Sequence, residues 1–255
     1  MSYVIAVAGK GGTGKTTIAA LIVRLLKEKN SGSILAVDAD PNSNLAEALG
    51  VETKQTIGTI LDDISTHPES VPPGMSKDRF VDYQVQTAIQ EAEGFDVLTM
   101  GKPEGPGCYC YVNNVLRNVV GKLIEDYEYV VIDNEAGLEH FSRRTTRFAD
   151  ALVVISDASS VGLKTAKRVG NLVKELNIKT KKNLLIINRS DNVVGKDILR
   201  KSLGDFLEDM DLDFIGNIPE DAQVKDISLN GSSLWELKDN AQSIAALRRI
   251  TEKIL

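Results

Sequence analysis

The sequence has few of the residues that mark specialised structural classes. Two cysteines in 255 residues provide no disulfide framework, so we expect a reducing, cytoplasmic location. No apolar run approaches the roughly 20 residues that cross a bilayer, and the first ten residues lack the basic segment of a secretory leader. The net charge of -6 argues against a nucleic-acid partner.

Short apolar runs instead alternate with segments of helical periodicity. Several of these runs are almost wholly apolar, as in parallel strands covered on both faces. The pattern predicts one doubly wound α/β domain over residues 1–255, a mostly parallel sheet with helices on both faces. The predicted strands are Tyr3–Ala8, Ile34–Val37, Val97–Met100, Tyr129–Ile132, Leu152–Ile155, Leu184–Ile187 and Phe214–Ile218. The predicted helices include Thr16–Lys29, Val115–Glu125, Leu163–Leu176, Lys196–Asp209 and Ala241–Ile254, and Ser65–Gly94 is interpreted as an irregular insertion.

The stretch GKGGTGKTT, between the first predicted strand and helix, fits the phosphate-binding motif G-x-x-x-x-G-K-[ST]. Glycines let the backbone approach a phosphate closely, so that successive N–H groups and the helix N-terminus point at its oxygens. Lys15 is expected to reach the β- and γ-phosphates of ATP, and the Thr16 hydroxyl to bind Mg²⁺. The predicted phosphate contacts are Gly9, Lys10, Gly11, Gly12, Thr13, Gly14, Lys15, Thr16 and Thr17.

Lys10, directly after the first glycine, gives the sequence K-G-G-T-G-K. This pattern resembles that of the deviant Walker A ATPases, the class that includes nitrogenase iron protein, MinD and ParA. The resemblance implies a nucleotide-dependent homodimer in which Lys10 reaches the partner's nucleotide and contributes to catalysis. The alternative is a solvated surface lysine.

Three aspartates follow buried strands in the order expected of the same class. The resemblance implies that Asp40 orients the attacking water, that Asp38 lies in the Mg²⁺ surroundings, and that Asp133 occupies the Walker B position. The segment Asn134–His140 is then the expected switch II. For Asp38 and Asp40, a helix-capping turn before Asn44 is the alternative.

The nucleobase end of the site is less specific. Asn188 matches an asparagine that contacts adenine in this class. The backbone of Pro219, Glu220 and Asp221 resembles the segment that contacts the adenine edge in the same class. Asn188, Arg189, Ser190 and Asp191 also share the spacing of the guanine-reading motif N-K-x-D, with arginine in place of lysine. We favour ATP over GTP.

Both cysteines, Cys108 and Cys110, lie in the loop GPGCYCYVNN. Two thiolates are half of a closed four-ligand Zn²⁺ site, so a two-fold dimer would supply four. The loop resembles that of the CooC-type ATPases, which serve nickel insertion into carbon monoxide dehydrogenase. This resemblance implies Ni²⁺ or Zn²⁺ at the dimer interface, with packing or redox roles as alternatives for the cysteines.

The sequence therefore favours an ATP-hydrolysing metallochaperone whose client is carbon monoxide dehydrogenase. A sister group serving acetyl-CoA synthase shares the motifs, so that client remains an alternative. Two different classes of function also fit the phosphate-binding motif: a MinD- or ParA-like positioning ATPase, and an electron-transfer ATPase with an iron–sulfur cluster. The last helix has an apolar stripe but few basic residues, so we expect no stable membrane association.

Overall fold

The structure is a computed structural model that describes residues 2–102, 109–136, 148–176, 178–190 and 210–255. Its framework is one sheet of eight described strands in the order β3-β4-β2-β5-β1-β6-β7-β8. All neighbouring strands are parallel except β3 and β4. The strands are β1 Tyr3–Gly9, β2 Ile34–Ala39, β3 Gln90–Ala92, β4 Phe95–Thr99, β5 Tyr129–Asn134, β6 Phe148–Ser156, β7 Lys179–Ser190 and β8 Asp213–Pro219.

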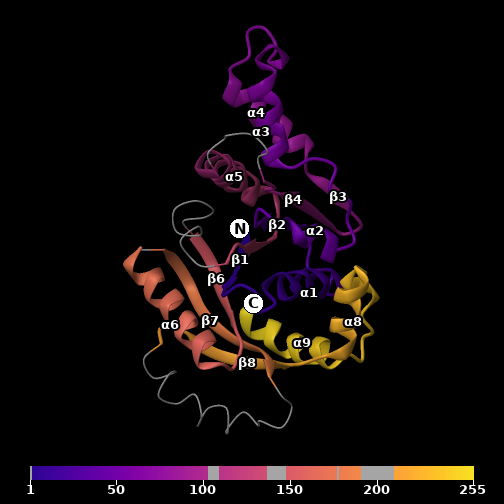
Figure 1. The fold of residues 1–255 in the computed structure, drawn as a ribbon, viewed down its shortest axis with the longest axis vertical. Coiled ribbons are helices and arrows are strands. Elements are labelled where there is room, and N and C mark those ends of the chain that lie inside the picture. The colour runs from indigo at the N-terminus through magenta and orange to yellow at the C-terminus, as the bar shows by residue number, and fades with distance from the viewer. Residues whose placement is uncertain (1, 103–108, 137–147, 177, 191–209) are drawn as a thin grey trace.

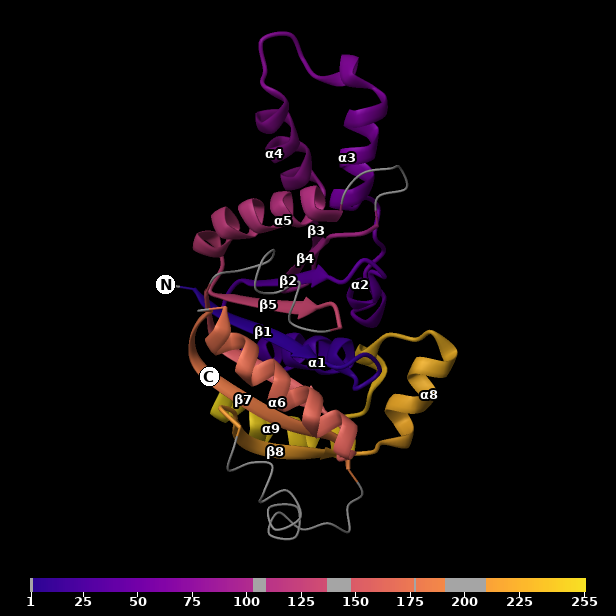
Figure 2. The same ribbon diagram turned by 60° about the vertical axis from the view of Figure 1, so that its left-hand side comes forward.

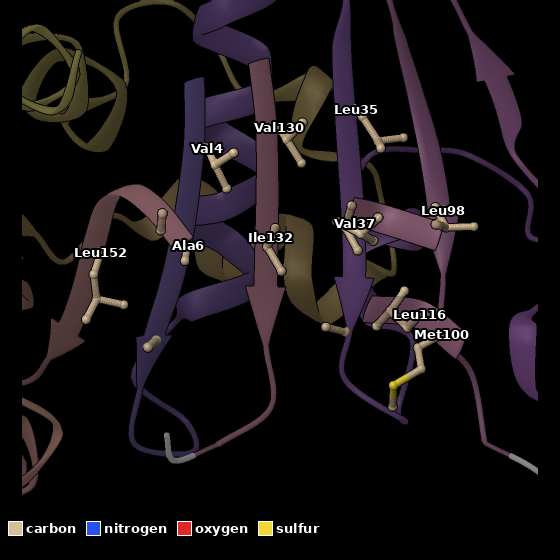
Figure 3. Close-up of a cluster of buried hydrophobic side chains, with 14 of the residues drawn as sticks. Val4, Ala6, Leu35, Val37, Leu98, Met100, Leu116, Val130, Ile132 and Leu152 are labelled. Atoms are coloured by element: carbon tan, nitrogen blue, oxygen red, sulfur yellow. The ribbon is translucent and has the colours of Figure 1, made fainter. Parts of the chain in front are cut away.

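Helices cover both faces of this sheet (Figures 1 and 2). One face carries α1, α2 and α9, and the other carries α5 and α6. Each face has its own buried apolar cluster. Figure 3 shows Val37, Ile132 and Leu116 of the second cluster, contributed by β2, β5 and α5. The helices are α1 Lys15–Glu28, α2 Asn44–Ala48, α3 Ile57–Thr66, α4 Lys77–Thr87, α5 Tyr109–Leu123, α6 Ser160–Glu175, α8 Ala222–Asn230 and α9 Gln242–Ile254.

The predicted fold class is confirmed, and all seven predicted strands are present with somewhat different ends. The insertion Ser65–Gly94 is more regular than predicted, because it contains the end of α3, all of α4 and the edge strand β3. One side of α4 is buried through Phe80, Val81 and Val85. Polar residues around these three make the apolar side of the helix hard to detect in the sequence. The predicted helix Lys196–Asp209 lies outside the described residues.

Two connecting helices, α3 and α4, form a hairpin that extends away from the sheet at the top of Figures 1 and 2. A capping box between Thr56 and Thr59 begins α3, and the Ser76 hydroxyl begins α4 by accepting from the Arg79 N–H. Apolar residues of both helices join the cluster that contains α5. The hairpin is therefore anchored against α5.

The apolar stripe of α9 is used within the fold. Ile244, Leu247, Ile250 and Ile254 are all buried against the cluster that contains α1. Among the helices that the structure describes, none combines the length and apolar character needed to cross a bilayer.

Candidate nucleotide-binding site

The loop between β1 and α1 depends on glycines at two positions where a side chain would collide with neighbouring residues. A Cβ on Gly9 would lie 2.2 Å from the carbonyl oxygen of Ile155 in the neighbouring strand β6. Gly14, at a φ of 91°, would bring a Cβ within 2.5 Å of Asn188 Nδ2. The Lys10 carbonyl accepts a 2.8 Å hydrogen bond from the Thr13 hydroxyl and tightens the turn. This backbone has the conformational freedom that a phosphate cradle requires.

Lys15 and Thr16 begin α1 at the carboxyl edge of the sheet, as the motif predicts. The Thr16 hydroxyl donates a 2.6 Å hydrogen bond to Asp133 Oδ2 at the end of β5. The other oxygen, Asp133 Oδ1, is buried and has no hydrogen-bond partner within the described residues. A hydroxyl beside a carboxylate with an unused oxygen fits a hard cation with oxygen ligands, such as Mg²⁺.

Asp38 and Asp133 lie side by side on the adjacent strands β2 and β5. Burial raises the pKa of Asp38 to about 7, and the nearby Asp133 charge adds to this rise against the hydrogen bond from the Leu45 N–H. Burial also raises the pKa of Asp133 to about 6, although Thr16 and Lys15 partly offset the effect. Two adjacent buried carboxyls with raised pKa values are short of positive charge, which Mg²⁺ would supply.

Asp38 also organises the turn that follows β2. Its Oδ1 accepts from the Asp40 N–H at 3.1 Å, and its Oδ2 from the Leu45 N–H at 2.8 Å. The structure therefore contains the helix-capping contact that was the alternative interpretation of this aspartate. The capping contact and a place beside Mg²⁺ are compatible, because Asp38 remains in register with Asp133.

Asp40 is only half-buried and lies at the rim of the site. Its Oδ1 accepts two 2.9 Å hydrogen bonds from Asn42, one from the backbone N–H and one from the side chain. Its charge adds to the rise in the pKa of Asp133, so the two carboxylates lie close enough to interact. This position suits a group that acts on a water molecule at the edge of the phosphate site.

Lys10 is exposed at the outer side of the loop. Within the described residues its ammonium group has no ion pair, whereas Lys15 is 7% exposed and lowers the pKa of Asp133. The two lysines of the motif therefore occupy different environments. Lys15 faces the interior of the site, and Lys10 is accessible to a partner.

The predicted base-binding residues border a pocket of about 320 Å³ beside α1. Asn188, Arg189, Pro219 and Glu220 line it together with Thr17, Ile18 and Leu21 of α1. The Asn188 side chain donates a 2.8 Å hydrogen bond from Nδ2 to the Thr13 carbonyl, so its other end, Oδ1, is an acceptor. At position 6 of the base, an acceptor suits the amino group of adenine and not the carbonyl oxygen of guanine. Asp191, the last residue of the guanine-type motif, lies outside the described residues.

The cysteine loop is only partly described. Cys108 lies outside the described residues, and Cys110 is known only by its backbone, in the first turn of α5. In the parts of the chain that the structure describes, no three His, Cys, Asp or Glu side chains are grouped as a metal site. His67 is exposed, with its Nδ1 3.1 Å from Asp63 Oδ1. Most of the expected switch II, including His140, lies outside the described residues.

Asp221, whose backbone was expected beside the adenine edge, also shapes the far wall of the base pocket through its side chain. Its Oδ1 accepts from the Gln223 N–H and begins α8, while its Oδ2 accepts from the N–H and hydroxyl of Ser243 at the start of α9. Burial opposes ionisation of Asp221, but these hydrogen bonds outweigh it and lower its pKa. The capping position was detectable in the sequence, whereas the contact with α9 was not.

Comparison with known proteins identifies the family. A family model described as the CobQ/CobB/MinD/ParA nucleotide binding domain matches residues 4–234. The chain belongs to this family. It is 41% identical to an uncharacterized ATP-binding protein of Methanocaldococcus jannaschii over 99% of this chain and 98% of the relative. It is also 31% identical to the carbon monoxide dehydrogenase accessory protein CooC of Rhodospirillum rubrum, over 95% of this chain and 94% of CooC.

Solved structures agree with this assignment at the level of the fold. The septum site-determining protein MinD of Pyrococcus horikoshii, complexed with Mg-ADP, superposes with a TM-score of 0.71 at 21% identity. The match covers 100% of this chain and 96% of that one. It shows that the chain has the MinD/ParA type of P-loop fold.

The raised pKa of Asp133 predicts how stability depends on pH. Between about pH 4 and pH 6 the nucleotide-free folded protein holds a proton on Asp133 that the unfolded chain has released, so the free energy of unfolding falls as pH rises. Asp133→Asn retains an acceptor for Thr16 but does not titrate. Its stability relative to wild type should increase across this window by on the order of 2 kcal/mol. Urea unfolding of both proteins at several pH values measures the difference in their free energies of unfolding. A difference that does not change with pH would contradict the raised pKa of Asp133.

Proposed function

We propose that this protein is an ATP-hydrolysing metallochaperone that dimerises on nucleotide and assists nickel insertion into carbon monoxide dehydrogenase. Nickel is its cargo, and ATP with Mg²⁺ drives the cycle. The proposal combines the geometry of the phosphate loop, the cysteine pair, and 31% identity with CooC along nearly the whole chain.

A backbone hydrogen bond between β2 and the residue after β4 supports the proposed link between the nucleotide site and the cysteine loop. The N–H of Met100 donates a 2.8 Å hydrogen bond to the carbonyl of Asp38, and the Met100 carbonyl accepts one of 2.8 Å from the Gly58 N–H. Met100 directly precedes the segment that leads to the cysteines. Its neighbour Thr99 lies in register with Asp38, and the Thr99 hydroxyl is buried with no partner in the described part of the chain. A movement of Asp38 would thus reach the base of the cysteine loop through the backbone.

The residues of the loop account for the phosphate chemistry. Lys15 and the N–H groups at the start of α1 bind the phosphate oxygens, and Thr16 and Asp133 hold Mg²⁺. When bound, Mg²⁺ neutralises the charge that develops on the transferred phosphoryl group. Asp40, at the rim, orients the attacking water.

The dimer explains two features of the chain. Lys10, without an ion pair in the described residues, is available to a nucleotide in a second copy. Two copies of the cysteine loop would supply four thiolates to one soft metal ion, the ligand number of a closed site. ATP would then favour the arrangement that holds nickel, and nickel would favour the arrangement that holds ATP.

Two alternative functions also fit the chain. Acetyl-CoA synthase is the alternative client, because it is also a nickel enzyme and the loop motifs fit both. A positioning role like that of MinD is supported by 26% identity with the septum site-determining protein of Bacillus subtilis. Burial of the apolar stripe of α9 argues against membrane attachment through this helix. Sedimentation with liposomes of anionic lipids, with and without ATP, tests the positioning role.

Substitutions in the phosphate site should separate binding from hydrolysis. Lys15→Ala should abolish tight binding of Mg·ATP, because the phosphate charge loses its buried counterion. Asp40→Asn should bind ATP within about threefold of wild type but hydrolyse it at least about a hundredfold more slowly, since it keeps its shape and loses the water-orienting carboxylate. Calorimetry and phosphate release measure the two steps. Equal weakening of ATP binding by both variants would remove Asp40 from this role, and a clear preference for GTP would reverse the base assignment.

Lys10→Ala should impair ATP-dependent dimerisation and turnover while the monomer still binds ADP nearly as wild type does. The exposed side chain makes no ion pair in the described part of its own chain that would explain such a loss. Light scattering with a slowly hydrolysed ATP analogue measures the dimer. Lys29→Ala, an exposed lysine just after α1, is the matched control. A dimer unaffected by Lys10→Ala would show that Lys10 is a solvated surface residue that does not act on the partner's nucleotide.

The cargo site is tested by metal stoichiometry. We expect about one tightly bound Ni²⁺ or Zn²⁺ per dimer, because a closed site needs four thiolates. Cys108→Ser and Cys110→Ser should each abolish tight binding and leave ATP binding intact, and binding should weaken at low pH because only thiolates bind the metal. Equilibrium dialysis with and without nucleotide measures both.

His67→Gln controls for adventitious nickel binding by the exposed pair of His67 and Asp63. One tightly bound metal ion per monomer, unaffected by either cysteine substitution, would refute a cargo site shared between subunits.

A further inference from the structure

Two consecutive residues at the end of β7 donate hydrogen bonds to two consecutive carbonyls of the phosphate loop. Asn188 Nδ2 donates to the Thr13 carbonyl at 2.8 Å, and Arg189 Nη1 donates to the Gly12 carbonyl at 3.1 Å. These bonds join segments that lie 175 and 177 residues apart in the sequence. The base end of the pocket is therefore tied directly to the loop that would hold phosphate.

The carbonyl bonds determine where the neighbouring N–H groups point. In a trans peptide the C=O and the following N–H lie on opposite sides of the bond. Because β7 holds the Gly12 and Thr13 carbonyls, the N–H groups of Thr13 and Gly14 are turned away from β7. The Thr13 N–H makes a long hydrogen bond of 3.4 Å to the Lys10 carbonyl, a weak contact that a phosphate oxygen would replace. N–H groups aligned in this way form the anion-binding concavity of a phosphate loop.

Arg189 adopts a backbone conformation that arginine rarely takes. Its φ of 54° is positive, and the only other non-glycine residues with positive φ in the described ranges are Asn30 and Ser43. The pairing of β7 with β8 shifts register between Ile187 and Ser190, and this irregularity contains Arg189. Glycine would adopt the same φ without strain. An arginine at this position thus indicates that its side chain contributes something that glycine cannot.

We propose that Arg189 is a positioning residue that holds the Gly12–Thr13 peptide in the orientation required for phosphate binding. Its guanidinium group carries a full charge, which strengthens a hydrogen bond to a carbonyl, and it remains exposed, so it loses little hydration. Arg189 also lines the base pocket with Pro219 and Glu220. A base packed there would hold Arg189 in place and thereby stabilise the phosphate loop.

This role differs from direct recognition of the base. A base-reading arginine would change the preference between adenine and guanine nucleotides when it is removed. A positioning arginine would weaken both nucleotides by a similar factor, because the phosphate loop serves both.

The test is ADP binding by calorimetry in the presence of Mg²⁺, and it rests on the nucleotide binding proposed above. Arg189→Gly removes the side chain and relieves the strain, and should weaken ADP by about tenfold, the loss of one charge-assisted hydrogen bond. Arg189→Lys keeps the charge and one donor, and should stay within about threefold of wild type. The ratio of ADP to GDP affinity should not change in either variant.

Asn30→Gly is the matched control, because it removes another positive-φ side chain far from the phosphate loop. It should leave ADP affinity unchanged. The melting temperature of nucleotide-free Arg189→Gly should not fall, which separates positioning from a general loss of structure.

Wild-type ADP affinity in Arg189→Gly would overturn the positioning role and leave the proposed function intact. Equal weakening of ADP binding by Arg189→Lys and Arg189→Gly would also overturn it. In that case neither the positive charge nor the hydrogen-bond donor at this position would account for the loss of affinity. A changed ratio of ADP to GDP affinity would assign Arg189 to the base instead. Absence of ADP binding by the wild-type protein would refute the nucleotide site itself.

Discussion

The site depends on the buried carboxyls of Asp38 and Asp133, which have too little positive charge around them. They lie on neighbouring strands where the parallel sheet brings its carboxyl ends together, and burial raises both pKa values. Such groups are costly unless something compensates them. Thr16 compensates one oxygen of Asp133, the turn after β2 compensates Asp38, and the remaining deficit is what a magnesium nucleotide would remove.

The same edge of the sheet connects the site to the rest of the molecule. β2 carries Asp38 and lies between β5, which carries Asp133, and β4, which leads towards the cysteines. On the other side of β1, the end of β7 holds the phosphate loop through Asn188 and Arg189. The carboxyl pair thus contacts the start of α1 through the Thr16 hydroxyl. It also contacts Met100, just before the segment that leads to the cysteines, through the hydrogen bond from the Met100 N–H to the Asp38 carbonyl.

The fold class and the contents of the phosphate loop were predictable from the sequence because both depend on local patterns. Apolar runs identify buried strands, and glycines beside a lysine and a threonine identify the loop. Contacts between distant segments were not predictable. Arg24, a helix residue that pattern alone would leave in solvent, is buried and donates to the carbonyls of Leu234 and Leu237. The contact of Arg189 depends on a register shift in a sheet, and that of Asp221 on the position of α9.

The most direct test of the role of this carboxyl pair is a crystal structure with Mg²⁺ and a slowly hydrolysed ATP analogue. We expect Mg²⁺ bound to Thr16 Oγ1 at about 2.1 Å, with Asp133 in direct contact or one water away. The phosphates should lie in the loop of residues 9–17, with the partner subunit's Lys10 beside them. A nucleotide bound away from this loop, or a Mg²⁺ ion near neither Thr16 nor Asp133, would contradict the magnesium-nucleotide site described above.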